Sequence, residues 1–375
     1  MVSVGRHPNI TLMSYSEVEQ VNGYVGNFSV TVRRKPRYVD EQLCNGCGTC
    51  SEKCPGKKIP SEFELGLGVR PAIYTPFAQA VPRIPVIDTV NCAYFKTGKC
   101  RACEKFCPRQ AIDFEQKEQH IEVDVGAIIL ATGFHDFDPR QAAQYGYGRL
   151  DNVVTGMEME RLINSGGPTN GKVFLKNGGR PQRIAILHCV GSRGEQHEYC
   201  SRVCCMYLAK QALLYKHAVP DGQAYIFYID TRSTGKGYEE FIQRVVGEGV
   251  LYLRGKVSKI FRDGDKIRVF GADTLSGKRV EIAADLVVLG MAIMPSEGTK
   301  ELLNKLGVTA DDTGFVLENH AKFRPLETGT EGIFVAGMAQ GPKDIPDSVA
   351  QGSGAASKVL TLFAQGERSK AAVGV

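Results

Sequence analysis

The sequence predicts an α/β protein that carries a compact cysteine-rich segment inside it. From residue 127 onward, short uninterrupted apolar runs alternate with helical stretches, a pattern typical of parallel strands buried on both faces. Between residues 40 and about 112 regular periodicity is absent, prolines and glycines are frequent, and eight of the twelve cysteines gather. We therefore expect a covered parallel sheet and, in the same chain, a small segment organised by bound ligands.

Composition excludes several classes of protein. The chain has 375 residues, 43% of them hydrophobic, which is enough for a sizeable core in two or three domains. Its net charge of +5 arises from 46 basic and 41 acidic residues without a long basic run, so we expect no nucleic-acid partner. The start, MVSVGRHPNI, has no apolar signal-peptide region, and no stretch approaches the roughly 20 apolar residues of a membrane span. We expect a cytoplasmic protein whose cysteines bind metal rather than form disulfides.

The expected elements follow from periodicity. Residues 28–33 alternate apolar and polar side chains after the turn-like residues 24–27, which predicts the end of a β-hairpin. Buried strands are expected at residues 127–130, 184–187, 225–228, 286–289 and 333–335. Helices are expected at residues 207–215, 238–246, 300–306 and 348–363.

Two cysteine motifs dominate the segment before the sheet. The first is Cys44-Asn-Gly-Cys47-Gly-Thr-Cys50-Ser-Glu-Lys-Cys54-Pro55, the C-x2-C-x2-C-x3-C-P run of two-cluster ferredoxins. The second keeps the last three positions but places seven residues between its first two cysteines, and it comprises Cys92, Cys100, Cys103 and Cys107-Pro108. This spacing predicts two [4Fe-4S] clusters.

In such motifs the fourth thiolate of each run reaches the other cluster. We therefore assign Cys44, Cys47, Cys50 and Cys107 to one cluster. The other cluster receives Cys92, Cys100, Cys103 and Cys54. Structural zinc is the alternative, but zinc does not explain a triple spacing that is followed twice by Cys-Pro.

The remaining four cysteines lie within seventeen residues, and they are Cys189, Cys200, Cys204 and Cys205. Cys189 ends an expected strand, whereas Cys200 and Cys204 stand four apart at the start of an expected helix. A strand end and a helix start can converge on one centre, which predicts a third cluster. Free buried cysteines are the alternative, because cysteine packs as a small hydrophobe.

The turn after residues 183–190 is where a two-domain flavin reductase carries a G-x-G-x-x-G loop for the pyrophosphate of NAD(P)H. Here it reads Cys189-Val-Gly191-Ser-Arg193-Gly194, so the glycine pattern is wrong and cysteines occupy the approach. We predict that this part of the chain does not bind NAD(P)H.

Two other segments have the pattern of flavin contacts. Each follows a strand and contains glycine, and the second continues into N-cap candidates for a helix whose positive end can face an isoalloxazine carbonyl. The residues of the first segment are Ala131, Thr132, Gly133 and Phe134. Those of the second are Gly337, Met338, Ala339, Gln340, Gly341, Asp344, Ile345, Asp347 and Ser348. Purely structural glycine turns, which are common in α/β proteins, are the alternative.

Together the motifs resemble a known family. The two Cys-Pro runs, ILATGF, CVGSR, YCSRVCCMYLAKQALL, FYIDTRSTGKGYEEF and GIFVAGMAQGPKDIPDSVAQGSGAA resemble the A subunit of heterodisulfide reductase over nearly the whole chain. The resemblance implies a thioredoxin-reductase-like two-domain flavoprotein fold with an inserted α+β two-cluster ferredoxin domain. It also implies a third [4Fe-4S] cluster in YCSRVCC, FAD at both flavin segments, and Lys210 near the flavin as a catalytic residue. Without the resemblance, Lys210 is simply a solvated helix lysine.

The chain departs from the family pattern at three places, one of which is that members often carry another ferredoxin module at the C-terminus. Family members carry a G-x-G-x-x-G unit ahead of the segment that matches HPNITLMSYSEVE, and this sequence starts after it, which predicts an N-terminally truncated relative with an incomplete FAD domain. Met338 stands where many relatives of the broader flavin fold have Asp. We therefore expect a partial FAD site, with FAD bound by this chain alone or only together with a partner chain.

The resemblance divides the chain into five segments. They are a remnant of the FAD domain at 1–39, the ferredoxin insert at 40–115, an FAD-domain segment at 116–165, an NAD(P)H-domain-like subdomain with the third cluster at 166–292, and a C-terminal FAD-domain segment at 293–375.

The implied function is electron transfer in a heterodisulfide-reductase-like complex. The family relays and bifurcates electrons between a donor module of hydrogenase, formate dehydrogenase or NADH dehydrogenase type, ferredoxin and a disulfide-reducing partner. Two alternatives remain open at this point. One is a flavin-free iron–sulfur wire or scaffold, and the other is an NAD(P)H-dependent reductase.

Overall fold

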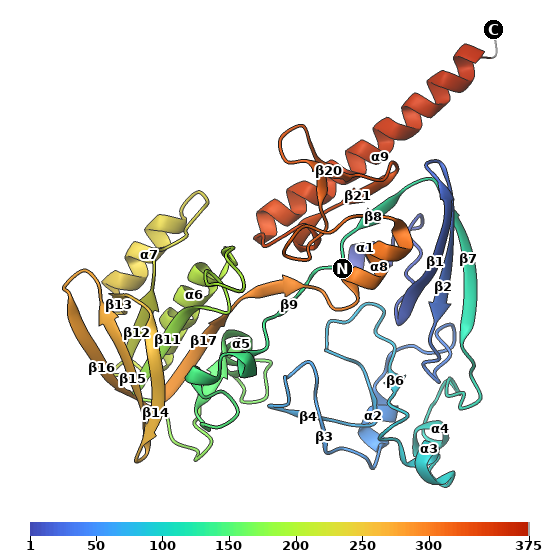
Figure 1. Ribbon diagram of the computed structural model, residues 1–375. Helices are drawn as coiled ribbons and strands as arrows, with labels where there is room; N and C mark the ends of the chain where they lie inside the picture. Colours follow the sequence, from blue (N-terminus) through green and yellow to red (C-terminus); the bar gives the residue numbers. More distant parts are fainter. Residues whose placement is uncertain (374–375) are drawn as a thin grey trace. The chain divides into compact units, whose positions relative to one another are not determined.

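The computed structural model describes residues 1–373. The chain forms two compact units (Figure 1). The first comprises Met1–Gly23 and Asn27–Val125, and the second comprises Tyr24–Gly26 and the residues from Gly126 onward. The finer division into five segments stays a prediction.

In the first unit, an antiparallel sheet has the strand order β1-β2-β7. Its strands are β1 (Ser16–Tyr24), β2 (Asn27–Arg34) and β7 (Gln119–Val125), and the predicted hairpin is thereby confirmed. Phe28 and Val30 are buried, as the alternating pattern of β2 requires. A short helix, α1 (Val2–Gly5), precedes the sheet.

Between β2 and β7 the first unit has only short elements. They are α2 (Thr49–Lys53), β3 (Ile59–Pro60), β4 (Val69–Arg70), β5 (Ile73–Tyr74), β6 (Val86–Ile87), α3 (Ala93–Thr97) and α4 (Ala102–Lys105). Buried Val39, Ile73, Ile87 and Phe114 pack around four buried cysteines in one core cluster. Cysteines therefore make up a large part of this small core. This agrees with the expectation, drawn from the absence of regular periodicity, that the segment lacks long helices and strands.

The second unit contains a five-stranded parallel sheet with the order β10-β17-β11-β12-β13. Its strands are β10 (Val153–Thr155), β17 (Leu286–Met291), β11 (Arg183–Val190), β12 (Gln223–Tyr228) and β13 (Leu251–Arg254). Ile184 and Ile186 pack on one face with helices α5 (Gly156–Ile163), α6 (Cys204–Ala218) and α7 (Tyr238–Gly247). Ala185 and Leu187 face the antiparallel sheet β14 (Val257–Asp263), β15 (Lys266–Asp273) and β16 (Lys278–Ala284). Both faces are covered, which explains the uninterrupted apolar runs.

A four-stranded sheet with the order β19-β20-β21-β8 forms the other part of the second unit. Its strands are β19 (Glu318–His320), β20 (Arg324–Thr328), β21 (Ile333–Val335) and β8 (Ile128–Leu130). The long helix α9 (Ile345–Val373) packs on it, with Ala355 against Phe334 and Ala336 (Figure 1). Strands β9 (Phe134–Asp136) and β18 (Ile293–Pro295) form an antiparallel pair, and α8 (Thr299–Leu306) follows β18.

Every strand and helix that the sequence predicts is present at its expected place, although α6 and α9 are longer than expected. The α/β class is therefore confirmed. Three short 3-10 turns complete the elements: Pro139–Gln141, Ala143–Tyr145 and Gly337–Ala339. None of the helices within residues 1–373 combines the length and hydrophobicity that crossing a bilayer requires.

A capping box stabilises the start of α5. Its contribution to the free energy of unfolding can be tested by substitution of the cap residue. Thr155 Oγ1 accepts the Glu158 N–H at 3.1 Å, and Glu158 Oε2 accepts the Thr155 N–H at 2.6 Å. Thr155→Ala should lower the free energy of unfolding by about 1 kcal/mol, because it removes the cap hydroxyl. Thr155→Ser should recover most of that loss in urea titrations followed by circular dichroism. Equal midpoints for the Ala and Ser variants would contradict the capping role.

Candidate functional site

Four cysteines of the first unit surround one small cavity. Cys44, Cys47, Cys50 and Cys107 line it, three from the first motif and one from the second. Local turns aim these thiols. Asp40 Oδ1 accepts the Gln42 N–H at 2.8 Å, and the Cys44 N–H bonds the Asp40 carbonyl at 3.0 Å. At Gly46, with φ of +70°, an added Cβ would lie 2.6 Å from the Arg83 carbonyl oxygen, so this turn requires glycine. We call this the first cage.

The second cage is lined by Cys54, Cys92, Cys100 and Cys103. Cys54 ends α2, and α2 packs on α4, which carries Cys103, so the last cysteine of the first motif reaches the second set. The structure therefore gathers the eight thiols in the two crossed sets that the sequence predicts. Their role as cluster ligands stays a prediction.

The arrangement of four thiols around each cavity fits a [4Fe-4S] cluster. Among residues 1–373, no three His, Cys, Asp or Glu side chains are grouped as ligands of one metal ion. In a [4Fe-4S] cluster each iron takes one thiolate, so the four thiols surround the group instead of meeting at a point. Burial raises the pKa of Cys103 to about 12, and burial also raises the pKa of Cys44 and Cys50. A positively charged group inside the cage is what would make these thiols ionise.

The third set of cysteines lies at the carboxyl end of β11 and the start of α6. Cys189 lies near the end of the strand with φ of +60°, and Cys204 and Cys205 are the first residues of the helix. Burial, followed by the nearby Cys205, raises the pKa of Cys189 to about 11. The pKa of buried Cys204 is raised by its hydrogen bond with Cys205, by burial and by the charges of Cys189 and Cys200. The four thiols are thus close enough to influence one another.

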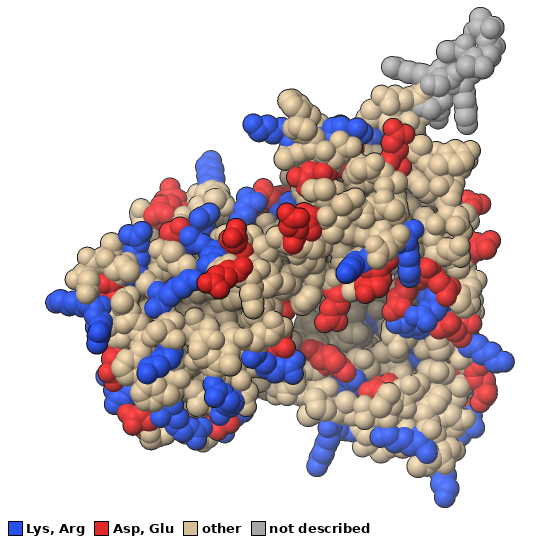
Figure 2. Space-filling model, in the orientation of Figure 1, with Lys and Arg blue, Asp and Glu red and all other residues tan. Residues whose placement is uncertain are grey.

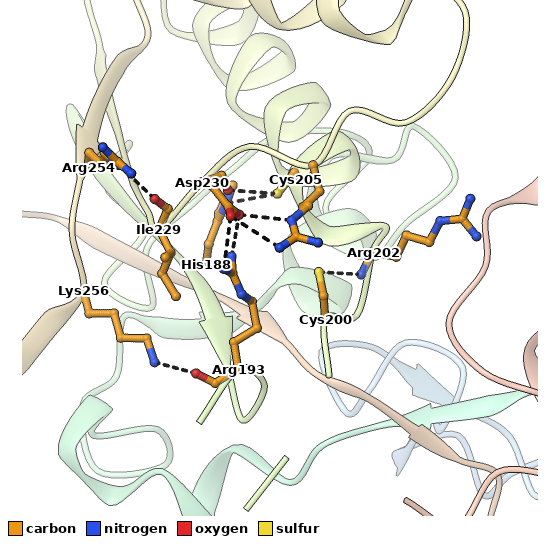
Figure 3. Close-up of polar contacts among 10 residues, drawn as sticks. His188, Arg193, Cys200, Arg202, Cys205, Ile229, Asp230, Arg254 and Lys256 are labelled. Atoms are coloured by element: carbon orange, nitrogen blue, oxygen red, sulfur yellow. Dashed lines mark hydrogen bonds and ion pairs between the residues drawn. The ribbon is translucent and has the colours of Figure 1, made fainter. Parts of the chain in front are cut away.

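Polar groups that the sequence analysis did not single out surround this third set (Figure 3). Cys205 Sγ lies 3.7 Å from His188 Nδ1 and 3.9 Å from the Asp230 carbonyl oxygen. The Arg193 guanidinium pairs with the Asp230 carboxylate at 2.5 and 3.1 Å, and its positive charge offsets part of the rise in the pKa of Cys189. His188 is buried, and its Nε2 has no hydrogen-bond partner. Arg193 lies in the motif CVGSR and Asp230 lies in the motif FYIDTRSTGKGYEEF, both of which the sequence analysis names. The motifs did not reveal that these two side chains lie close to the thiols.

The side chains of Phe137 and His197 pack against the turn after β11 at Gly191. Gly191 has φ of +82°, and a Cβ added there would lie 2.5 Å from the Phe137 ring. His197 Nδ1 lies 3.0 Å from the Gly191 carbonyl oxygen. The turn is thus packed by an aromatic ring and occupied by Cys189. The expectation that it does not bind NAD(P)H stays a prediction.

The two flavin segments leave the same edge of one sheet. Strands β8 and β21 pair in parallel, with Leu130 opposite Val335, so residues 131–134 and 337–341 emerge side by side. Thr132 Oγ1 is buried without a hydrogen-bond partner, and Gly133, with φ of +75°, has open space at its Cβ position. An unpartnered buried hydroxyl beside an open glycine turn fits a bound polar group.

The second segment is held by the start of α9. The Gly337 N–H donates to Gln351 Oε1 at 2.8 Å, and Gln351 Nε2 donates to Gln340 Oε1 at 2.6 Å. Asp344 Oδ1 accepts the Asp347 N–H at 2.9 Å, as the predicted N-cap does. Ile345 is 81% exposed beside these polar groups. Of the other segment members, Ala339 is buried, whereas Met338, Gly341 and Ser348 are partly exposed.

One ion pair joins the third set of cysteines to the second flavin segment. The Arg202 N–H lies 3.3 Å from Cys200 Sγ, and the Arg202 guanidinium pairs with Asp347 at 2.5 Å. The thiol loop and the amino end of α9 are therefore in direct contact. Arg202 was absent from the predicted site residues, although it lies between two of the predicted cysteines.

Lys210 lies in a mostly apolar pocket with the flavin-segment residue Phe134. Its Nζ donates to both carboxylate oxygens of Glu160 at 2.7 Å, and Gln211 Nε2 donates to Glu160 Oε2 at 3.0 Å. Burial raises the pKa of the nearby Asp136. Lys210 is therefore a paired lysine in a pocket rather than a free surface lysine, and its catalytic role stays a prediction.

Comparison with known proteins agrees with this geometry. The Fer4 model, described as a 4Fe-4S binding domain, matches residues 37–57. The chain is 47% identical over 372 residues to the A subunit of H(2):CoB-CoM heterodisulfide,ferredoxin reductase from Methanothermobacter thermautotrophicus, covering 98% of this chain and 56% of that protein. It is also 47% identical over 373 residues to the iron-sulfur A subunit of CoB--CoM heterodisulfide reductase from Methanocaldococcus jannaschii, with the same coverage. In sequence, the chain is similar over 98% of its length to heterodisulfide reductase A subunits.

The family resemblance that the motifs predicted is thereby confirmed, as is the 4Fe-4S type of the first motif. The chain spans 56% of the length of these heterodisulfide reductase A subunits. Among solved structures, the thioredoxin reductase of T. acidophilum is similar with a TM-score of 0.42 and 16% identity, covering 67% of this chain and 68% of that chain.

The crossed cages can be tested by pairs of substitutions. Each single variant, Cys54→Ala or Cys103→Ala, should cost about four irons per chain. The double variant Cys54→Ala/Cys103→Ala should cost no more than either, because both thiols line the second cage. The matched double variant Cys50→Ala/Cys54→Ala should cost about eight, because it opens both cages. Iron analysis and electron paramagnetic resonance give the counts, and the reverse pattern would mean that each motif holds its own cluster.

Proposed function

We propose that the chain is an iron–sulfur flavoprotein electron-transfer subunit of a heterodisulfide-reductase-like complex. The observation that carries this proposal is the contact chain from Cys200 through Arg202 to Asp347, which joins a four-cysteine centre to a partial flavin site. Two four-thiol cages in the first unit add a ferredoxin-like section.

Each part of the chain has a defined task in this proposal. The cage thiols and the third set hold three [4Fe-4S] clusters, which carry single electrons. Thr132, Gly133 and the amino end of α9 would hold FAD, which would supply the chemistry of electron exchange there. Lys210, held by Glu160 in the pocket that Phe134 also lines, places a positive charge beside the flavin segment.

The names of the relatives support the proposed complex. Proteins named as A subunits of heterodisulfide reductase support a multi-protein assembly with ferredoxin, a disulfide-reducing partner and an electron-donor module. In this assembly the chain relays electrons and, with FAD bound, bifurcates them. Cluster potentials span about −700 to +450 mV, so the ligands alone do not set the direction of flow.

A flavin-free electron wire is the second candidate. Strand β8 ends the order β19-β20-β21-β8, and among the described residues no strand pairs with its outer edge. Neither flavin segment has the G-x-G-x-x-G pattern that cradles a pyrophosphate. Both observations favour a site that is incomplete without another polypeptide.

Iron content tests the third cluster. The anaerobically purified chain should contain about twelve irons, and Cys200→Ala/Cys205→Ala should contain about eight. Ser192→Ala is the matched control, because it alters the same turn through a buried hydroxyl without removing a thiol. Eight irons in the unaltered chain would remove the third centre from the proposal.

Flavin binding separates the two candidates. The chain should bind FAD when a relative's G-x-G-x-x-G segment is supplied as a separate polypeptide, and Thr132→Val should weaken binding about tenfold, or ~1.4 kcal/mol, because the hydroxyl is lost. Thr309→Val, at an exposed position, is the control. Flavin absorbance is the measurement. If no flavin binds in either the presence or the absence of the added segment, the flavin-free electron wire is the remaining candidate.

A further inference from the structure

We propose that His188 and Arg193 are positioning residues of the third set of cysteines. They direct an N–H donor and a positive charge at its thiols and thereby raise the reduction potential of the cluster held there. This inference rests on the proposed function, because it concerns the cluster that this function assigns to the third set.

His188 is placed by its strand. Side chains alternate along β11, so His188 shares a face with Ile184 and Ile186, and α6 covers that face. His188 is buried at the end of the face, and its Nδ1 lies 3.7 Å from Sγ of Cys205, the second residue of α6. A polar ring therefore continues a row of apolar side chains up to a thiol of the third set.

The other ring nitrogen of His188 supports a role toward this thiol. Within residues 1–373, Nε2 is buried without a hydrogen-bond partner, and the polar contact of the ring is the Cys205 thiol. A buried polar atom without a partner is unfavourable, so hydrogen bonding at both nitrogens does not explain this ring. A thiolate has no proton to donate. Once Cys205 binds metal as a thiolate, Nδ1 is therefore the atom that carries the proton and donates to Sγ.

A positive charge approaches the third set from the turn after β11. The Arg193 side chain is only 18% exposed, and the Asp230 carboxylate holds its guanidinium at 2.5 and 3.1 Å. Arg232 lies 3.3 and 3.4 Å from the same carboxylate, so two guanidinium groups share one negative charge. Figure 3 shows Arg193 and Asp230 gathered with His188 beside Cys205. A net positive charge therefore remains next to the thiols.

These contacts favour the reduced form of a cluster. Reduction adds one electron and neither forms nor breaks a bond, so the cluster becomes one charge more negative. A positive charge or an N–H donor at a ligating sulfur stabilises that added charge and raises the reduction potential. Exposed charges act more weakly, because water and salt screen them, and Figure 2 shows such charges of both signs spread over the surface. Arg193 is mostly buried, so its charge is screened less.

The cages of the first unit provide an internal reference. In the first cage, neutral backbone groups donate to the thiols, with the Gly46 N–H 3.4 Å from Cys44 Sγ and the Ala111 N–H 3.3 Å from Cys107 Sγ. His188 and Arg193 belong to the second unit and line neither cage. Their substitution should therefore move the potential of the third cluster and leave the potentials of the two cages in place.

The test is a redox titration of the full chain, followed by electron paramagnetic resonance. Comparison with Cys200→Ala/Cys205→Ala identifies the signal of the third cluster by difference. Arg193→Gln should lower the ratio of reduced to oxidised third cluster about tenfold at a fixed potential, which equals a shift of about 59 mV for one electron. His188→Leu should lower the same ratio about threefold or more, and His188→Gln, which keeps an N–H donor, should recover most of that loss.

Further variants separate charge from structure. Asp230→Asn should raise the potential of the third cluster, because it removes a negative charge and keeps an oxygen that accepts from Arg193. The matched controls are Arg244→Gln and His217→Gln, which alter exposed side chains that pair with Glu248 and should leave the potential unchanged. If His188→Leu loses iron, His188→Gln and Asp230→Asn still carry the test.

Three outcomes would overturn the proposal. The first is an unchanged potential in Arg193→Gln and His188→Leu at full iron content. The second is an equal shift in the two cages, which would assign the effect to the chain as a whole. The third is a lower potential in Asp230→Asn, because charge would then not be the cause. Failure of the proposed function is recognised separately, since about eight irons in the unaltered chain would remove the third cluster before any variant is made.

Discussion

Each thiol cage is closed by a cysteine from the other motif, and the first unit depends on this exchange. The segment between β2 and β7 has strands of two residues and helices of four or five, too short to form an extended core. Four of its buried residues are cysteines that share a core cluster with Val39, Ile73 and Phe114. Packing of α2 on α4 brings Cys54 to the second cage, while Cys107 returns to the first. The contacts that bring the cysteines of each cage together are therefore also the contacts that form the core of this unit.

The second unit differs from the first, because apolar packing on both faces of a parallel sheet stabilises it. The parallel sheet has helices on one face and β14–β16 on the other, and the carboxyl end of β11 carries Cys189 to the amino end of α6. In α/β sheets this edge is where ligands bind. Here thiols, His188 and the Arg193–Asp230 pair occupy it. Arg202 then links it to α9, so the third set of cysteines and the second predicted flavin segment meet through one side chain.

Sequence reasoning found elements whose periodicity is strong and missed those whose burial is partial. β11 and β17 have long apolar runs because both faces are covered. β14 and β16 bury only some of their residues, so their patterns are mixed and they were not predicted. The site shows the same limit. Cysteine spacing predicted the two crossed sets, whereas Glu160 beside Lys210 and Gln351 beside Gly337 lie 50 and 14 residues away from their partners. A local sequence pattern does not predict hydrogen bonds between residues so far apart in the chain.

The sequence by itself determined the kind of chemistry, the family resemblance and the most strongly periodic strands and helices, because ligand spacing and hydrophobic periodicity are short-range properties of a chain. Only the tertiary structure decided which groups surround each thiol and which side chains are paired or left without a partner. Thr132 Oγ1 and His188 Nε2 are unpartnered only because of what packs around them. Lys210 is paired because α5 and α6 pack together on one face of the sheet. These contacts arise from burial of distant segments against one another, which no single stretch of sequence contains.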